Sequence, residues 1–151
     1  LMSLDAKTGK MKLLDRQRDE AWIGGPGIGF NLSSGNVGWI DNETFYFQSE
    51  ADGYSHLYTV NVKTGEKKQL TKGKWEVQQA QLSRDKMAFY LTTNEVHPGE
   101  QHFYKMTIAD GKRTQITNGV GANDVTISPD ETKLAIRFSY INQPWELFYQ
   151  D

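Results

Sequence analysis

The sequence predicts an all-β fold built from repeated four-stranded antiparallel sheets, because two patterns recur along it in a fixed order. The first pattern is LMSLDAKTGK, which recurs as LYTVNVKTGE and FYKMTIADGK and, in short form, as LFYQD. These segments start at Leu1, Leu57, Phe103 and Leu147, about 56, 46 and 44 residues apart. A period of roughly 40–50 residues is typical of one four-stranded β-propeller blade. The sequence therefore predicts a partial β-propeller of about three blades with an incomplete ring.

The second pattern is a short strand, a polar turn and a longer apolar strand, and it precedes each of the last three copies of the first. It occurs as GWIDNETFYFQSE from Gly38, QLSRDKMAFYLTTN from Gln81 and TISPDETKLAIRFS from Thr126. The turns contain Asp, Asn or Pro, which bond their own backbone or preset φ in tight turns. The apolar strands after them suit positions covered on both faces, as inner blade strands are.

A glycine hairpin turn ends each long copy of the first pattern, at Thr8-Gly9, Thr64-Gly65 and Asp110-Gly111. Glycine supplies the positive φ that such turns need. The strands that follow, KMKLL, KKQLT and RTQIT, alternate polar and apolar residues as half-exposed outer strands do. We therefore expect truncation of an outer-strand side chain such as Lys67 to change the free energy of unfolding by about 0.5 kcal/mol or less.

Together the patterns predict the outer two strands of one blade at about residues 1–15 and three further blades at about 34–72, 75–118 and 121–151. The last blade is expected to have three strands. No segment has a helical period over more than two turns. The first residues resemble the middle of a domain, so we expect the chain to be a piece of something longer.

Composition excludes several classes of function. The net charge is -2 and the 17 Lys and Arg residues are scattered, whereas binding to nucleic acid needs a concentrated basic face. The chain has no cysteine and so no disulfide, thiolate metal site or cysteine nucleophile. No apolar run approaches the roughly 20 residues of a membrane helix. We expect neither nucleic acid nor a membrane as a partner.

The segment from Phe47 to Val77 resembles a blade of the dipeptidyl peptidase IV branch of prolyl oligopeptidase-family serine peptidases. In that branch a strand ends in Ser-(acidic or Asn)-x-x-Gly-(aromatic)-x-His, and the next linker is Thr-x-Gly-x-Trp-Glu-Val. The matching residues here are Ser49, Glu50, Gly53, Tyr54, His56, Thr71, Gly73, Trp75, Glu76 and Val77. The segment AWIGGPGIGFN is similar to a linker of that branch, and SYINQPWELFYQD is similar to its closing blade.

The resemblance implies a non-catalytic propeller segment of a serine exopeptidase, of the dipeptidyl or acylaminoacyl peptidase type. In that family the propeller caps the active site of an α/β-hydrolase domain, which is absent here, and limits substrate size. The implied partners are a peptide substrate, bound through the parent enzyme, and the missing hydrolase domain and remaining blades. A periplasmic or extracellular location is favoured.

Two sequence features of the family's active site have no match in this chain. These are the nucleophile motif G-x-S-x-G and the Glu-Glu pair that holds the substrate's amino terminus. We therefore expect no catalytic residue in this segment. Dipeptidyl specificity does not follow from the segment alone.

The candidate site is the segment from Trp22 to Phe30, which contains four glycines and one proline. It joins an outer strand to the inner strand of the next blade and must cross one face of the propeller. By resemblance, the matching linker lines the substrate cavity. The candidate substrate-lining residues are Trp22, Ile23, Gly25, Pro26 and Phe30. The alternative is an ordinary crossing between blades.

Two other functions stay open at this point. A metal-dependent propeller lyase would need His56, His97 and His102 as ligands, but His56 and His102 stand at the same place in two repeats, which favours a hydrogen bond to a neighbouring turn. We expect no metal and no cofactor. The second alternative is a propeller binding or scaffold module without peptidase activity. Because an incomplete ring exposes apolar faces and a strand edge, self-association is also expected.

Overall fold

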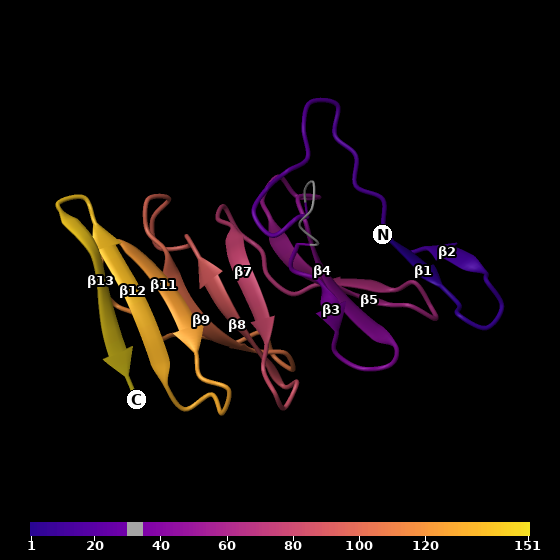
Figure 1. Cartoon of the computed structure of the whole chain (residues 1–151). Coiled ribbons are helices and arrows are strands. Elements are labelled where there is room, and N and C mark those ends of the chain that lie inside the picture. The colour runs from indigo at the N-terminus through magenta and orange to yellow at the C-terminus, as the bar shows by residue number, and fades with distance from the viewer. Residues whose placement is uncertain (30–34) are drawn as a thin grey trace. The chain divides into compact units, whose positions relative to one another are not determined.

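The computed structural model describes residues 1–29 and 35–151, and these residues form strands β1 to β13 in four antiparallel sheets (Figure 1). They fall into two units, Leu1–Thr71 and Lys72–Asp151. No helix that could cross a membrane occurs in the described residues. The predicted fold class, an all-β partial propeller, is confirmed. Each of the three predicted blades encloses one of the three larger sheets, while the exact blade boundaries stay predictions.

The first unit contains a hairpin and a four-stranded sheet. The hairpin pairs β1 (Met2–Leu4) with β2 (Met11–Leu13). The sheet has the order β3 (Gly38–Trp39), β4 (Thr44–Ser49), β5 (His56–Asn61) and β6 (Lys67–Gln69). Consecutive strands are neighbours, as the hairpin turns predict.

Apolar side chains of the hairpin's end and of the sheet form the core of this unit. Leu14, Phe47 and Val60 are buried together, and Phe45, Tyr58 and Val62 pack against them. The hairpin is also tied to the sheet by Lys12, whose Nζ donates to the carbonyls of Val62 at 3.2 Å and Lys63 at 2.5 Å. Burial and these charge-assisted bonds together fix the hairpin on the first sheet.

The structure gives Lys67 a partner that the outer-strand pattern did not reveal. Lys67 is exposed on β6, but its Nζ lies 2.7 Å from Oδ1 of Asp15, which is only 7% exposed. A buried carboxylate needs a partner, so Lys67 is part of the connection between the hairpin and the sheet. The pattern of a half-exposed strand could not reveal a partner 52 residues away along the chain.

The second unit contains a four-stranded and a three-stranded sheet. The first has the order β7 (Val77–Leu82), β8 (Ala88–Thr93), β9 (His102–Thr107) and β10 (Arg113–Gln115). The second has the order β11 (Ala122–Ile127), β12 (Leu134–Tyr140) and β13 (Gln143–Gln150). Every residue of β8 is buried, which fits the continuous apolar run that predicts an inner strand.

The two sheets of the second unit share one core. Tyr90 and Phe103 of the first sheet stack with ring centroids 5.7 Å apart, and they are buried with Val125, Leu134 and Ile136 of the second. The backbone N–H of Asn123 on β11 donates to the carbonyl of Gln101 at 3.1 Å. Each sheet therefore covers the face that its neighbour exposes, as adjacent propeller blades do.

The Ser-x-Asp turns of these sheets repeat the same hydrogen bonds. Ser128 Oγ donates to Asp130 at 2.6 Å, and the backbone N–H of Lys133 donates back to Ser128 Oγ at 2.9 Å. Ser83, Asp85 and Ala88 make the equivalent contacts in the preceding sheet. Bonds to Ser128 and Thr132 lower the pKa of the Asp130 carboxyl to about 2. The polar turn residues therefore stabilise their own turns by local hydrogen bonds.

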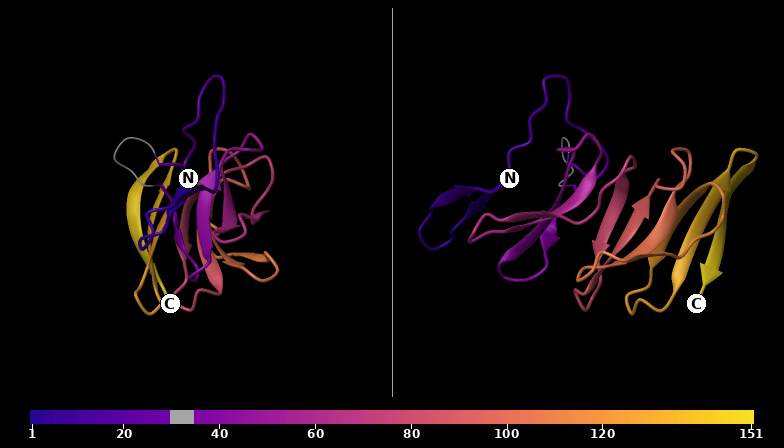
Figure 2. Two further views of the ribbon diagram at one scale, coloured as in Figure 1. Left: turned by 90° about the vertical axis from the view of Figure 1, so that its right-hand side faces the viewer. Right: turned by 180° about the vertical axis from the view of Figure 1, so that it is seen from behind.

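The strand β13 lies at the edge of its sheet in every view (Figures 1 and 2). Its apolar side chains are exposed: Trp145 by 52%, Leu147 by 76% and Tyr149 by 62%. In the first unit, the hairpin likewise exposes large apolar side chains, namely Met2, Leu4, Met11 and Leu13. The hairpin and β13 therefore each carry exposed apolar surface.

Candidate functional site

Residues 15–29 of the linker between β2 and β3 extend away from the strands of the first unit (Figure 1). The described part of the linker ends at Gly29 and resumes at Gly35. Glycine is needed at Gly27 and Gly35, since both have a φ of 71°, a conformation that L side chains rarely adopt. Within the segment from Trp22 to Phe30, glycine at position 27 therefore has a conformational cause.

A cavity of about 510 Å³ lies between this linker and the end of β4. Its linker wall is formed by residues 15–19 and 21–23. The opposite wall is formed by Ser49, Glu50, Ala51 and Gly53, with Lys67 from β6. Ser49, Glu50 and Gly53 belong to the motif Ser-(acidic)-x-x-Gly, so that motif forms a wall of the cavity.

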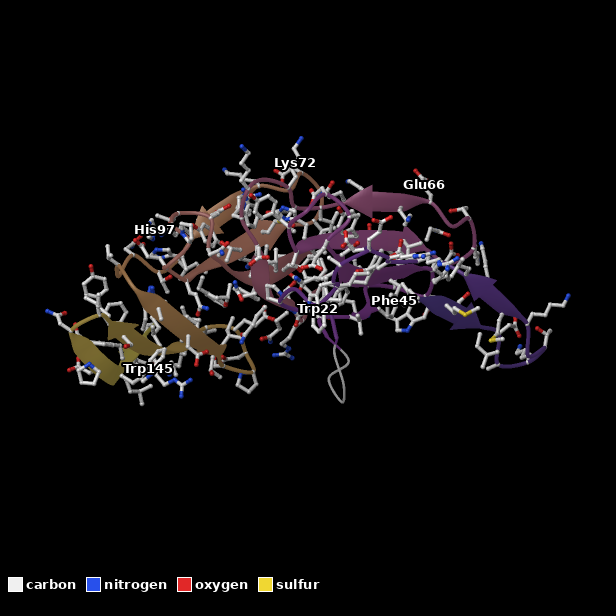
Figure 3. The ribbon with its side chains drawn as sticks, turned by 90° about the horizontal axis from the view of Figure 1, so that it is seen from above. Trp22, Phe45, Glu66, Lys72, His97 and Trp145 are labelled. Atoms are coloured by element: carbon white, nitrogen blue, oxygen red, sulfur yellow. The ribbon has the colours of Figure 1, made fainter. Side chains whose placement is uncertain are left out.

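Two of the five predicted site residues, Trp22 and Ile23, line the cavity. Trp22, labelled in Figure 3, is 68% exposed. The turn before it is held by Asp19, whose Oδ1 accepts the backbone N–H groups of Ala21 at 2.8 Å and Trp22 at 3.3 Å. These two bonds lower the pKa of the Asp19 carboxyl and keep it an acceptor at neutral pH.

The other three predicted residues have different positions. Gly25 lies against the Glu50 carboxylate, where a Cβ would overlap that side chain. The Pro26 carbonyl accepts hydrogen bonds from Ser55 Oγ at 2.6 Å and Gln48 Nε2 at 3.1 Å. Neither residue lines the cavity; Gly25 lies close to Glu50, and Pro26 attaches the linker to Gln48 and Ser55. Phe30 lies outside the described residues.

The residues of β4 and of the turn after it that hold the linker could not be identified from the sequence. Gln48 and Ser55 bond the Pro26 carbonyl, and Glu50 accepts the backbone N–H of Gly24 at 3.3 Å. One signal was present: Gln48 is the polar residue that directly follows the apolar run Phe45–Phe47, and it is 2% exposed. A buried amide needs hydrogen-bond partners, but the sequence does not show where those partners lie.

The charged side chains around the cavity balance one another. Three are acidic, namely Asp15, Asp19 and Glu50, and three are basic, namely Arg16, Arg18 and Lys67. A cavity of balanced charge discriminates by shape and hydrogen bonding more than by net charge. The Glu-Glu pair of the resembled family has no counterpart here.

The histidine prediction is confirmed for both repeated positions. His56 Nδ1 lies 3.0 Å from Thr71 Oγ1, and His102 Nδ1 lies 3.2 Å from the Thr117 carbonyl. The two rings are buried and belong to the strand starts of β5 and β9. The third histidine, His97, is exposed (Figure 3). Among the described residues, no three His, Asp or Glu side chains are grouped as metal ligands would be.

The Trp-Glu-Val motif also has a structural role in the second unit. The guanidinium of Arg113 lies 4.8 Å from the centroid of the Trp75 ring and pairs with Glu95 at 2.9 Å. This cation–π contact fixes the segment that leads into β7. Trp75 therefore packs on its own sheet.

Comparisons with known proteins show the family of this chain. Residues 1–145 match the model of the family described as "Dipeptidyl peptidase IV (DPP IV) N-terminal region". The dipeptidyl peptidase 4 of Trichophyton equinum is 27% identical over 132 residues, which cover 85% of this chain and 16% of that protein. A probable dipeptidyl peptidase 4 of Neosartorya fischeri is 35% identical over 95 residues, covering 51% of this chain and 12% of that protein.

A solved structure shows the same fold. The crystal structure of Porphyromonas gingivalis dipeptidyl peptidase 4 matches with a TM-score of 0.64 and 22% identity, over 75% of this chain and 16% of that chain. The matched residues thus span 12% to 16% of the length of these proteins. Since the family model covers all but the last few residues, the chain belongs to the family of dipeptidyl peptidase IV N-terminal regions.

Proposed function

We propose that this chain is the propeller part of a serine-type dipeptidyl peptidase-like hydrolase, where it caps the active site and limits the size of the substrate. The match of residues 1–145 to the dipeptidyl peptidase IV N-terminal region carries this proposal. The reaction itself belongs to a hydrolase domain outside this segment. The segment supplies a wall, and the partner bound by that wall is a peptide.

The cavity beside the linker supports the wall function. Trp22 and Ile23 offer an aromatic and an aliphatic surface, and the backbone around Gly25 and Pro26 is tied to the sheet by hydrogen bonds. A fixed, concave surface with a few polar groups is the usual form of a ligand site. Such a wall admits an extended peptide and excludes a folded protein.

The proposal is tested on the protein encoded by the complete gene. Peptides of increasing length with proline in the second position are incubated with it, and released dipeptides are measured by mass spectrometry. We expect release from short peptides, its loss with a serine-reactive fluorophosphonate, and no release from a folded protein with the same first residues. Release that resists the inhibitor contradicts the serine mechanism. Equal release from the folded protein contradicts the size limit.

A further inference from the structure

The side chain of Gln48 is a polar group inside an apolar sheet. It stands on β4 next to the core residue Phe47 and is 2% exposed. A buried amide without hydrogen bonds destabilises the fold. Its partners therefore indicate what the residue does.

The described partners of this amide belong to the linker or to the turn beside it. Nε2 donates to the Pro26 carbonyl at 3.1 Å and to Ser55 Oγ at 3.0 Å. Oε1 accepts a hydrogen bond from Asn36 Nδ2. Ser55 Oγ in turn donates to the same Pro26 carbonyl at 2.6 Å. One side chain thus contacts the linker at two places, Pro26 and Asn36.

The backbone of Gln48 adds a third attachment. Its carbonyl accepts a hydrogen bond from Gln17 Nε2 at 2.9 Å, and Gln17 lines the cavity. The linker's limbs are also bonded to each other, since the backbone N–H of Asn36 donates to the Gly27 carbonyl at 2.8 Å. Gln48 is therefore the residue on which the hydrogen bonds of the linker converge.

The linker has a glycine, Gly27, at the point where the Gln48 amide approaches it. At Gly27 a Cβ would overlap the amide groups of both Gln48 and Asn36. The φ of 71° at Gly27 also disfavours a side chain. Close approach and backbone conformation thus require glycine at the same point, which couples the linker's path to the Gln48 side chain.

We propose that Gln48 is the positioning residue of the candidate substrate wall: its buried amide fixes the turn at Gly25–Gly27 and so sets the cavity beside Trp22 before a ligand binds. The inference rests on the proposed function for the role of the wall. Gln48 lines no part of the cavity, so it acts through the linker.

Hydrogen exchange in the complete protein tests the positioning. The variants are Gln48→Leu, which removes the amide, and Gly27→Ala, which disturbs the same contact from the linker side. The backbone N–H of Ile28 donates to the Gly25 carbonyl at 3.3 Å, and that of Asn36 donates to Gly27. We expect protection of peptides containing these two amides to fall by about tenfold or more in both variants, because local opening becomes easier.

Three controls separate positioning from general destabilisation. Gln79→Leu makes the same substitution at an exposed position on β7. Peptides of the buried strand β8 report on the second unit and should keep their protection in all variants. The double variant should lose no more protection than either single one, since both act on one contact. Unchanged exchange in the linker, or an equal loss in β8, overturns the positioning role even if the enzyme is active.

Kinetics on the same variants tests the link to the substrate. For dipeptide release we expect the KM of Gln48→Leu to rise by about tenfold with a much smaller change in kcat, because wall contacts bind substrate without taking part in the chemistry. Gln48→Glu keeps the acceptor for Asn36 but loses the donor to the Pro26 carbonyl, so its KM should also rise. An active Gln48→Leu enzyme with a loosened linker and normal KM overturns the inference. Absence of activity in the wild-type complete protein instead overturns the proposed function, and exchange still decides whether Gln48 fixes the linker.

Discussion

At the residue scale, the fold depends on a few side chains that are wholly enclosed. Phe89 on β8 is 0% exposed, and its neighbours Tyr90 and Leu91 are 5% and 0% exposed. Phe89→Ala should lower the free energy of unfolding by about 3–5 kcal/mol, because it removes apolar contacts and leaves a cavity. The measurement is the denaturant midpoint against wild type. A shift no larger than that of Lys68→Ala, on the exposed outer strand β6, would show that the assignment of inner and outer strands is wrong.

The free energy of unfolding should depend on acidic pH through carboxylates such as Asp130, which accept hydrogen bonds within their turns. In the folded state the pKa of Asp130 is lowered from 3.8 to about 2, first by the Ser128 hydroxyl and then by Thr132. The folded state therefore binds fewer protons than the unfolded state between those values. The stability from this group is complete above about pH 4 and is lost as the pH falls toward 2.

Asp130→Asn removes this titration. Its free energy of unfolding should decline less steeply than that of wild type when the pH is lowered through the same range. Urea denaturation at a series of pH values measures both slopes. Identical slopes would mean that the hydroxyl and backbone hydrogen bonds to Asp130 do not lower the pKa of its carboxyl in solution.

At the element scale, the contact between the hairpin and the first sheet depends on the pair of Lys67 and Asp15. Lys67→Ala leaves a buried carboxylate oxygen without its donor, so we expect a loss of about 1–3 kcal/mol. Lys68→Ala, at the next position of β6, should change stability by about 0.5 kcal/mol or less. Equal midpoints for the two variants in chemical denaturation would show that the ion pair is not formed in solution.

The elements themselves could be predicted from the sequence because the repeats determine them locally. The turn residues Asp130 and Gly111 and the apolar runs around Phe89 carry their own conformational preferences, so the strand order follows from neighbours in sequence. The linker could be located for the same reason, since a stretch rich in glycine and proline has no regular alternative.

What holds the linker could not be predicted in the same way. Gln48 and Pro26 are 22 residues apart and Lys67 and Asp15 are 52 apart, so both contacts depend on how the hairpin, linker and sheet pack. Alternation of polar and apolar residues predicts the face of the sheet on which a side chain lies, but it does not predict the partner of that side chain. The hydrogen bonds and ion pairs that hold the linker and the hairpin could therefore be identified only from the structure, whereas the strands and turns could be predicted from the sequence.

At the scale of the whole molecule, the 151-residue chain should not behave as an ideal monomer. The exposed edge of β13 offers unpaired backbone groups beside Trp145 and Leu147, and such edges pair with other chains. Light scattering over a range of concentrations should show a mass that rises with concentration, or aggregation. A monomeric mass throughout, with one sharp thermal transition, would mean that these apolar faces are covered within the chain.

The measurement that tests the central claim most directly compares peptidase activity of two proteins. One is the 151-residue chain and the other is the protein encoded by the complete gene, both assayed with a chromogenic dipeptide substrate containing proline. A propeller segment without a nucleophile motif predicts no turnover by the chain alone and inhibitor-sensitive turnover by the complete protein. Turnover by the repurified chain that a serine-reactive inhibitor abolishes, or no turnover by the complete protein, would contradict this account.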